Sequence, residues 1–236
     1  MKKIAILQSN YIPWKGYFDI IAAVDEFIIY DEMQYTKNDW RNRNKIKTFN
    51  GLKWLTIAVD SKNRITEKLR ICDVKIANKE WNTIHWNTIL QTYSKAKYFK
   101  DYKEIFKDLY LNCDEEFLSL INYKFIKGIN EILGIKTKIS WSSEYNIIEG
   151  KTERLIDLCK KSGATEYISG PAAKDYLDDS LFKSECIKLT WMDYSGYPEY
   201  SQLYPPFVHG VSIIDLIFNE GANAHKYMKN FDGNKK

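Results

Sequence analysis

The chain has 236 residues, of which 44% are hydrophobic, so it is long enough for one sizeable domain with a hydrophobic core. Its 35 basic and 31 acidic residues give a formal net charge of +4, which is too small and too dispersed to indicate binding to duplex DNA. Four widely separated cysteines argue against a zinc ribbon or a disulfide framework, and three histidines without short spacing argue against a metal site. Only four apolar residues follow Lys3 and no apolar stretch reaches the length of a membrane span, so we expect a cytoplasmic protein without a signal peptide.

Two short apolar runs, at residues 4–7 and 27–30, bracket a helical stretch at residues 17–24. This order predicts strand, loop, helix and strand. Polar residues follow each strand, and ligands bind at the carboxyl ends of the strands in an open parallel sheet. We therefore expect one rim of the sheet to hold Gln8, Ser9, Asn10, Asp31, Glu32 and Gln34.

The middle of the chain predicts one strand followed by three helices. Residues 52–59 are apolar and rich in β formers, and they follow the turn signal Asn50-Gly51. The third helix is stopped by Gly134, which suits the residue after a helix end. Together these helices define a helical region at about residues 79–134. The three predicted helices cover residues 79–97, 101–111 and about 114–133.

Strands and helices alternate again in the C-terminal half. Thr152 is placed to cap a helix that ends at Gly163. Another helix begins at Ser212, where S-x-x-D with Asp215 is a capping-box pattern. The predicted strands are residues 136–141, 167–170 and 187–192. The whole pattern predicts a single α/β domain over residues 1–236, with a mostly parallel, Rossmann-like sheet flanked by helices.

A basic and aromatic cluster follows the second predicted strand. It contains Trp40, Arg41 and Arg43. Arginine binds phosphate bidentately, and tryptophan stacks on a base, so the cluster suits a nucleotide ligand. The alternative interpretation is an exposed charged loop. Asp31 is also open to two interpretations, because strand-end aspartates commonly close turns, whereas the crowding by Glu32 favours a site.

The histidines are the candidates for a general base. His85 lies on an otherwise apolar helix stripe, so it is either a satisfied core residue or a catalyst. His209 lies in a turn just before the helix at Ser212, a loop position where function concentrates. Both have an unperturbed pKa near ~6.5, whereas the pKa of Asp31 would need to be raised by burial. We favour His85, because its helix also presents Tyr93 as a hydrogen-bonding partner for substrate.

Short motifs of polar, aromatic and glycine residues are spread over nearly the whole chain. They are Gln8 with Tyr11, Pro13 and Gly16-Tyr17-Phe18; Tyr30-Asp31 with Gln34; Trp40 with Asn42-Arg43-Asn44; Trp54-Leu55-Thr56; Tyr167-Ile168-Ser169-Gly170 with Tyr176-Leu177; and Ser212-Ile213-Ile214-Asp215 with Asn219 and Gly221. Together they resemble the WbqC-like protein family, whose members occur in O-antigen and related surface-polysaccharide gene sets. The family usually has proline directly after the first glutamine, where this chain has Ser9. The resemblance favours Arg43 over Arg41 as a site residue.

The N-terminal loop is also similar to a second group of proteins. A strand, then Pro13-x-x-Gly16-Tyr17-Phe18, then a helix resembles the nucleotide-binding entry of nucleotidylyltransferases and class I synthetases. Those enzymes carry a Gly-His pair where this chain has Gly16-Tyr17, and their histidine assists at the nucleotide phosphates. The resemblance implies a shared scaffold, while the tyrosine argues against adenylyl transfer.

The family resemblance implies that the protein modifies an activated sugar, by attaching glycine or a similar acyl group to an amino sugar. The sequence has no G-x-S-x-G elbow, no P-loop and no complete G-x-G-x-x-G. Direct attack by the sugar amine on a bound acyl donor is therefore the simplest mechanism. The alternatives are an ATP-dependent enzyme that activates an acid or transfers a nucleotidyl group, and a non-catalytic accessory protein that binds sugar nucleotides.

We therefore expect an N-acyltransferase, of the glycyl or aminoacyl type, that acts on the amine of a nucleotide-linked amino sugar. No tightly bound cofactor is expected; the co-substrate would be a thioester or an aminoacyl ester, carried by an acyl carrier or as aminoacyl-tRNA. The candidate catalytic residues are His85, Asp31 and His209. The candidate substrate-binding residues are Gln8, Asn10, Tyr11, Tyr17, Gln34, Trp40, Asn42, Arg43, Asn44, Tyr93 and Ser169.

Overall fold

A five-stranded parallel sheet organises the molecule. The computed structural model describes residues 1–60 and 68–231. The strands are ordered β7-β2-β1-β8-β9, and every neighbouring pair is parallel. Their bounds are β1 Lys3–Leu7, β2 Glu26–Ile29, β7 Lys138–Trp141, β8 Glu166–Ser169 and β9 Lys188–Trp191. The predicted α/β fold with a mostly parallel, Rossmann-like sheet is confirmed.

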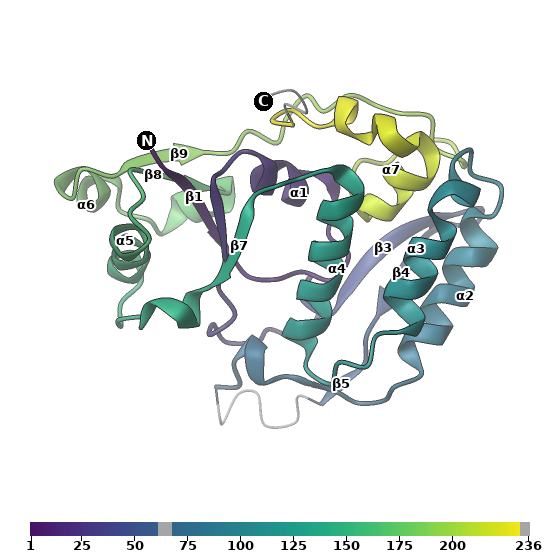
Figure 1. Ribbon diagram of the computed structural model, residues 1–236, viewed down its shortest axis with the longest axis horizontal. Coiled ribbons are helices and arrows are strands. Elements are labelled where there is room, and N and C mark those ends of the chain that lie inside the picture. The colour runs from purple at the N-terminus through teal and green to yellow at the C-terminus, as the bar shows by residue number, and fades with distance from the viewer. Residues whose placement is uncertain (61–67, 232–236) are drawn as a thin grey trace.

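Helices cover both faces of this sheet, which is why its strands are apolar on both sides. Ala5 of β1 packs into the core on one face, while its neighbours Ile4 and Ile6 pack into a second core on the other. The first face is covered by α1 (Lys15–Ala22) and α4 (Leu118–Leu133). The second face is covered by α5 (Thr152–Lys161) and α6 (Asp179–Ser184), which lie on the left of Figure 1.

The chain reverses its direction across the sheet at β1. From β1 it passes through α1 to β2 and later to β7, moving toward one edge. Helix α5 then brings it back to β8, on the other side of β1, and β9 continues to the opposite edge. The carboxyl ends of β1 and β8 therefore flank the topological switch point, where open α/β sheets bind their ligands.

The three helices predicted in the middle of the chain are confirmed. They are α2 (Trp81–Tyr93), α3 (Phe99–Leu111) and α4, and α4 ends at Gly134 with φ +74°. Helix α7 (Ile213–Glu220) begins at Ser212, whose hydroxyl accepts a hydrogen bond from the Ile214 N–H as an N-cap. Four 3₁₀ helices complete the regular structure of the described residues: η1 Ile71–Asp73, η2 Ser142–Tyr145, η3 Pro171–Asp175 and η4 Gly221–Tyr227.

An antiparallel hairpin stands apart from the main sheet. Strand β3 (Arg43–Thr48) pairs with β4 (Gly51–Thr56), and β5 (Val59–Asp60) pairs with β6 (Lys75–Ile76). The interpretation of the basic cluster as an exposed loop is wrong for its last residue, because β3 begins at Arg43. The predicted strand at 52–59 is split into β4 and β5. Ile46 and Leu55 turn the inner face of the hairpin into the core, while Arg43 and Lys45 share the opposite face with Trp54.

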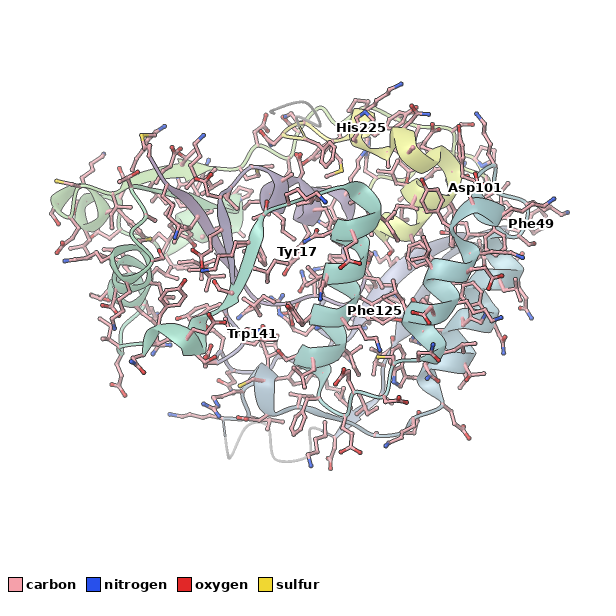
Figure 2. All side chains as sticks on the ribbon, viewed as in Figure 1. Tyr17, Phe49, Asp101, Phe125, Trp141 and His225 are labelled. Atoms are coloured by element: carbon pink, nitrogen blue, oxygen red, sulfur yellow. The ribbon has the colours of Figure 1, made fainter. Side chains whose placement is uncertain are left out.

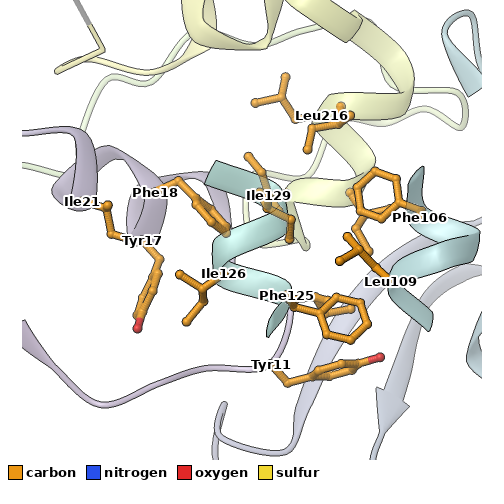
Figure 3. Packing of buried hydrophobic residues seen from close by; sticks show 14 of the residues in the cluster. Tyr11, Tyr17, Phe18, Ile21, Phe106, Leu109, Phe125, Ile126, Ile129 and Leu216 are labelled. Atoms are coloured by element: carbon orange, nitrogen blue, oxygen red, sulfur yellow. The ribbon is translucent and has the colours of Figure 1, made fainter. Parts of the chain in front are cut away.

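Large aromatic and aliphatic side chains fill the space between the sheet, the hairpin and the helices. Figure 3 shows Leu109, Phe125 and Tyr11 packed together in this core, with Ile126 between them and the ring of Tyr17. Phe49, by contrast, lies at the exposed right-hand edge of the molecule in Figure 2, in the turn of the hairpin. Within residues 1–60 and 68–231, no helix has the length and apolar character that crossing a membrane requires.

Candidate functional site

A cavity of about 500 Å³ opens at the topological switch point, and we call it the switch-point cavity. The ends of β1, β2 and β8 form its floor, and the N-terminal turn of α5 forms one wall. Its lining residues are Ile6, Leu7, Gln8, Tyr30, Met33, Gly150, Lys151, Arg154, Leu155, Tyr167 and Tyr176. This is the position at which the strand order predicts a ligand.

The switch-point cavity carries positive charge that has no acidic partner. The guanidinium of Arg154 donates to the Ile148 carbonyl oxygen at 2.6 Å and to the Tyr30 hydroxyl at 3.2 Å. Among the described residues, no carboxylate lies within 4.0 Å of Arg154 or of the Lys151 amine. No side chain caps the N-terminus of α5, whose backbone N–H groups add partial positive charge. The cavity therefore suits an anionic ligand.

A second hollow of about 290 Å³ is lined in part by the loop that follows β1, and we call it the tryptophan cavity. Most of its lining surface is apolar. Gly210, in the loop before α7, is also part of the lining. Its lining residues are Asn10, Pro13, Trp14, Trp40, Asn44 and Gly210. Aromatic walls with two carboxamides suit a ligand that has a flat or apolar group and a few polar atoms.

Arg41 joins the two cavities. Its guanidinium donates through one terminal nitrogen to the side-chain oxygen of Gln8 and through the other to that of Asn10. Because arginine can only donate, both carboxamide oxygens must face it, and both NH₂ groups are turned away. Neither NH₂ group has a hydrogen-bond partner in the part of the chain that the structure describes. Gln8 and Asn10 thus present free donors to the switch-point and tryptophan cavities respectively.

Arg41, and not the favoured Arg43, is the arginine that bonds two residues of the cavity linings. We favoured Arg43, but the structure places Arg43 on the outer face of the hairpin, with its guanidinium 4.3 Å from the Trp54 ring centroid, and it lines neither cavity. The two arginines lie two residues apart, and strand β3 begins at Arg43, so only Arg41 lies in the loop before it. Gln34, also predicted in the site, is exposed and bridges to Arg70, away from both linings. The ligand roles of Arg43 and Gln34 remain predictions.

A buried carboxylate holds the loops of the site together. Asp31 accepts hydrogen bonds from the Ser9 N–H at 2.8 Å, from the Ser9 hydroxyl at 2.6 Å and from the Ser119 hydroxyl. Asn122 of α4 donates to the Ser9 hydroxyl at 3.0 Å and to the Arg41 carbonyl at 2.9 Å. A proline at position 9 could not donate the first of these bonds.

Asp31 lies behind the cavities rather than in them. Its side chain is 1% exposed, and burial raises its pKa, although the bonds from Ser119 and Ser9 oppose the rise. The structure brings Asp31 to the same edge as Gln8 and Asn10, as the strand pattern indicated. Its contacts favour a structural role, and a catalytic role for it remains a prediction.

His85 is enclosed in the aromatic core. The residue is 5% exposed, its Nδ1 lies 2.8 Å from the Tyr11 hydroxyl, and its ring also hydrogen-bonds the Thr56 backbone. Burial lowers its pKa to about 4, so the ring is neutral at pH 7. His85 is bonded within the core and lines neither cavity, and this placement favours a structural histidine. A role for His85 as the general base remains a prediction that its surroundings disfavour.

Most other predicted binding residues are likewise engaged inside the protein. Tyr93 donates to Asp215 at 2.9 Å, and Tyr17 donates to the Gln8 carbonyl at 3.0 Å. Asn42 donates to the Ile57 carbonyl at 2.8 Å. Ser169 is buried at the end of β8. These contacts shape the loops around the site, whereas Trp40, Asn10 and Asn44 do line a cavity.

The predicted capping box at the start of α7 is confirmed for Ser212 but not for Asp215. Its predicted partner Ser212 caps α7, but the Asp215 carboxylate accepts from Tyr93, Tyr200 and Gln202 and not from the Ser212 backbone. The capping-box interpretation of Asp215 is therefore wrong, and Asp215 instead joins α7 to α2 and the loop before α7.

His209 is the predicted catalytic residue that lies at the surface of the site. It directly precedes Gly210, which lines the tryptophan cavity, and its ring packs 4.6 Å from that of Phe207. Partial burial, and then the positive charge of Lys15, lower its pKa below 6.5. An exposed imidazole that is neutral at pH 7 is able to accept a proton.

The loop that resembles nucleotidylyltransferases has a structural explanation. A Cβ on Gly16 would lie 2.3 Å from the Trp14 ring, so glycine is needed for Trp14 to fold over the start of α1. Tyr17, which stands where the nucleotidylyltransferases and class I synthetases carry their histidine, is buried. These contacts lend no support to adenylyl transfer. Among the described residues, no group of three or more His, Cys, Asp and Glu side chains is arranged to hold a metal ion.

Comparison with known proteins identifies the family without naming a reaction. The chain is 48% identical over 229 residues to the uncharacterized protein Rv1507c of Mycobacterium tuberculosis, an alignment that covers 97% of this chain and 98% of that protein. No solved structure matches the chain significantly. The model of the WbqC-like protein family matches residues 8–227, which include the tryptophan cavity, the Arg41 bridge and all of the switch-point lining except Ile6 and Leu7. The chain therefore belongs to the WbqC-like protein family.

Proposed function

We propose that this protein is an N-acyltransferase, of the glycyl or aminoacyl type, that acts on the amine of a nucleotide-linked amino sugar in surface-polysaccharide biosynthesis. One observation carries the proposal: Arg41 bonds the carboxamide of Gln8, which lines a cationic cavity at the switch point, and that of Asn10, which lines a second, aromatic cavity. Two cavities of different chemistry, linked through one arginine, suit a reaction between two substrates.

The sugar nucleotide fits the switch-point cavity. Lys151 and Arg154 have no carboxylate partner among the described residues and would bind the diphosphate, and the uncapped N-terminus of α5 would add N–H donors. Tyr30 and Tyr176 supply aromatic faces for the base or the sugar. The amine of the sugar would then lie toward Gln8, at the boundary with the tryptophan cavity.

The activated acyl group fits the tryptophan cavity. The sugar amine would attack its carbonyl carbon, forming the C–N bond, and the C–S or C–O bond to the carrier would break. The NH₂ groups of Gln8 and Asn10 are free to donate to the oxyanion that develops in this step. His209 would take the proton from the amine and return it to the departing thiolate or alkoxide.

A transfer assay tests this function directly. The protein is incubated with a nucleotide-linked amino sugar and either an acyl or aminoacyl thioester or an aminoacyl ester, and the N-acylated sugar is detected by mass spectrometry. The expected result is an amide product without ATP. Pyrophosphate release from ATP would instead indicate an acid-activating enzyme, and binding of the sugar without turnover would indicate an accessory protein.

Histidine variants test the proposed base. His209→Asn should lower turnover by ~10²-fold or more, as expected for loss of a general base, while affinity for the sugar nucleotide is retained. His225→Asn is the matched control, because His225 hydrogen-bonds the Ala222 carbonyl near the C-terminus and touches neither cavity. His85→Asn should lower thermal stability and leave turnover near normal. A large loss of turnover in a stably folded His85→Asn protein would restore His85 as the base.

A further inference from the structure

The segment around the β3–β4 hairpin concentrates the positive charge of the protein. Residues 36–56 contain six basic residues and one acidic residue, a net charge of +5, compared with +4 for the entire chain. The acidic residue, Asp39, lies 3.7 Å from Arg41. Arg43 donates to the Asn38 carbonyl and helps to lower the pKa of Asp39, but neither Arg43 nor Lys45 has a carboxylate within 4.0 Å among the described residues.

Aromatic rings are interleaved with these charges. Lys45 pairs with Trp54 across the hairpin, and its amine lies 4.8 Å from the Trp54 ring centroid. Trp40 packs 5.5 Å from Trp54 and is 43% exposed, while Trp54 is 40% exposed. The Arg43 guanidinium lies over Trp54, and its Nε is buried without a hydrogen-bond partner in the described part of the chain.

This surface runs directly into the tryptophan cavity. Trp40 belongs to both, because one indole lines the cavity and also packs against Trp54 on the hairpin. A ligand that follows the hairpin would therefore end beside Asn10 and Asn44. Alternating cations and exposed aromatic rings suit a single-stranded nucleic acid, whose phosphates meet the cations while its bases stack on rings or guanidinium planes.

The hairpin does not need these charges for its own stability. An exposed cation–aromatic pair contributes only about 0.5–1 kcal/mol, and two like charges on one strand face repel each other. The inner face of the hairpin, through Ile46 and Leu55, already fixes it to the core. A polyanion would remove the repulsion between Arg43 and Lys45.

We propose that the outer face of the hairpin binds the single-stranded 3′ end of an RNA, and that its terminal nucleotide enters the tryptophan cavity. The inference rests on the proposed function, for which it identifies the acyl donor as an aminoacyl ester on the terminal ribose. In that position the ester carbonyl would lie beside the free NH₂ of Asn10. The sugar amine replaces the ribose oxygen on the acyl carbon, and the ribose hydroxyl leaves with a proton.

Fluorescence anisotropy with a labelled eight-nucleotide RNA that has a free 3′ hydroxyl tests the binding. The double variant Arg43→Gln/Lys45→Gln should bind at least 10-fold more weakly than wild type. The slope of its log affinity against log salt concentration should be shallower by roughly 0.7 for each phosphate that the variant no longer neutralises. The charge-preserving variant Arg43→Lys/Lys45→Arg should retain most of the affinity. Lys174→Gln is the matched control, because Lys174 lies over the ring of Trp191, on β9 rather than on the hairpin.

Four outcomes would overturn the proposal: no binding of the RNA by wild type, equal affinity of the Arg43→Gln/Lys45→Gln protein, equal or tighter binding of a blunt RNA duplex, or equal or tighter binding of single-stranded DNA. A 3′-phosphorylated RNA should bind more weakly than the free hydroxyl form, and equal binding would remove the terminal nucleotide from the cavity. Melting curves of every variant show whether the hairpin is still folded.

A thioester donor separates this inference from the proposed function. Lys45 lines neither cavity and is not among the candidate substrate-binding residues, so acyl transfer from a small thioester should be unchanged in the Lys45→Gln protein. Transfer from the thioester without any RNA binding would refute the RNA site and keep the acyltransferase. RNA binding without transfer from any donor would support the RNA site and refute the acyltransferase.

Discussion

The amino ends and the carboxyl ends of the strands of the central sheet differ in how their charged side chains are paired. We call these two ends of the sheet the amino edge and the carboxyl edge. At the amino edge, Glu26 of β2 is buried and pairs with Lys2 at 2.6 Å and Lys138 at 2.9 Å, and Glu166 of β8 pairs with Lys188 at 3.2 Å. At the carboxyl edge, the cations Lys151 and Arg154 have no carboxylate within 4.0 Å among the described residues. Charges at the amino edge are compensated inside the protein and stabilise it. Charges at the carboxyl edge remain available to a ligand, as the strand order requires.

The carboxyl edge has its own buried carboxylate, but with neutral partners. Asp31 accepts bonds from Ser9 and Ser119, and Asn122 extends this network to the backbone of Arg41. The network fixes the loops that carry Gln8, Asn10 and Arg41, whose guanidinium pairs with Asp39 at 3.7 Å. Asp31 thus holds the loops of the carboxyl edge in place, while Lys151 and Arg154 remain without a carboxylate partner among the described residues.

Removing Asp31 should produce the largest change. Asp31→Ala leaves the Ser9 N–H and the Ser9 and Ser119 hydroxyls without their acceptor in a buried site, so we expect a loss of about 3 kcal/mol in the free energy of unfolding. Urea denaturation measures it. Asp31→Asn keeps one acceptor oxygen and should lose less. A loss below about 1 kcal/mol for Asp31→Ala would mean that water replaces the carboxylate, and that the network does not hold the loops.

Arginine at the carboxyl edge should matter for binding, and lysine at the amino edge should not. Arg154→Gln removes a charge-assisted contact to the proposed diphosphate, so the dissociation constant for a nucleotide-linked amino sugar should rise about 10- to 100-fold in calorimetric titrations at fixed salt. Lys188→Gln, at the amino edge, is the control and should bind like wild type. Equal affinities for wild type and Arg154→Gln would show that Arg154 does not bind the sugar nucleotide, and that the proposed functional difference between the two edges is wrong.

The pH dependence of stability should have opposite signs at the two edges. Although burial opposes ionisation, hydrogen bonds from Lys2, Ser140, Tyr145 and Lys138 hold the pKa of Glu26 at about 2, below its ordinary value of 4.5. The stability that Glu26 contributes is therefore present above pH 4.5 and is lost as the pH falls toward 2. For Asp31, the raised pKa means that the folded state takes up its proton first, so its contribution improves as the pH falls through that pKa.

Unfolding experiments on two variants check these signs. Glu26→Gln should flatten the loss of stability between pH 4.5 and 2, by an amount on the order of 1 kcal/mol because its lysine partners are partly exposed. Asp31→Asn should steepen the acid loss relative to wild type, because it removes the opposing contribution. Curves of the same slope for wild type and Glu26→Gln would show that the amino-edge pairs add nothing measurable.

Local sequence patterns predicted two kinds of element: strands that are buried on both faces, and helices whose ends are set by nearby residues. Strands β1 and β2 are short apolar runs because both faces of the sheet are covered, and Gly134 ends α4 because the chain needs a positive φ there. The pattern did not predict β3, because its outward residues are basic and its apolar face is a single Ile46. That strand forms because β4 pairs with it and the core accepts Ile46.

The sequence by itself determined the order of strands and helices, the rim formed by Gln8, Asn10 and Asp31, and the family to which the chain belongs, since each depends on residues close together in the chain or on motif content. Only the tertiary structure decided which side chains face the cavities. Arg41 and Arg43 are the same residue type, yet Arg43 begins strand β3 and lies on the hairpin surface, whereas Arg41 precedes the strand and bonds Gln8 and Asn10, which line the cavities. Lys151 and Arg154 reach β1 because α5 returns the chain across the sheet. His85 became a core residue because Tyr11, 74 positions away, supplies its hydrogen bond. Contacts between residues so distant in sequence leave no local periodicity, so packing alone assigns these roles.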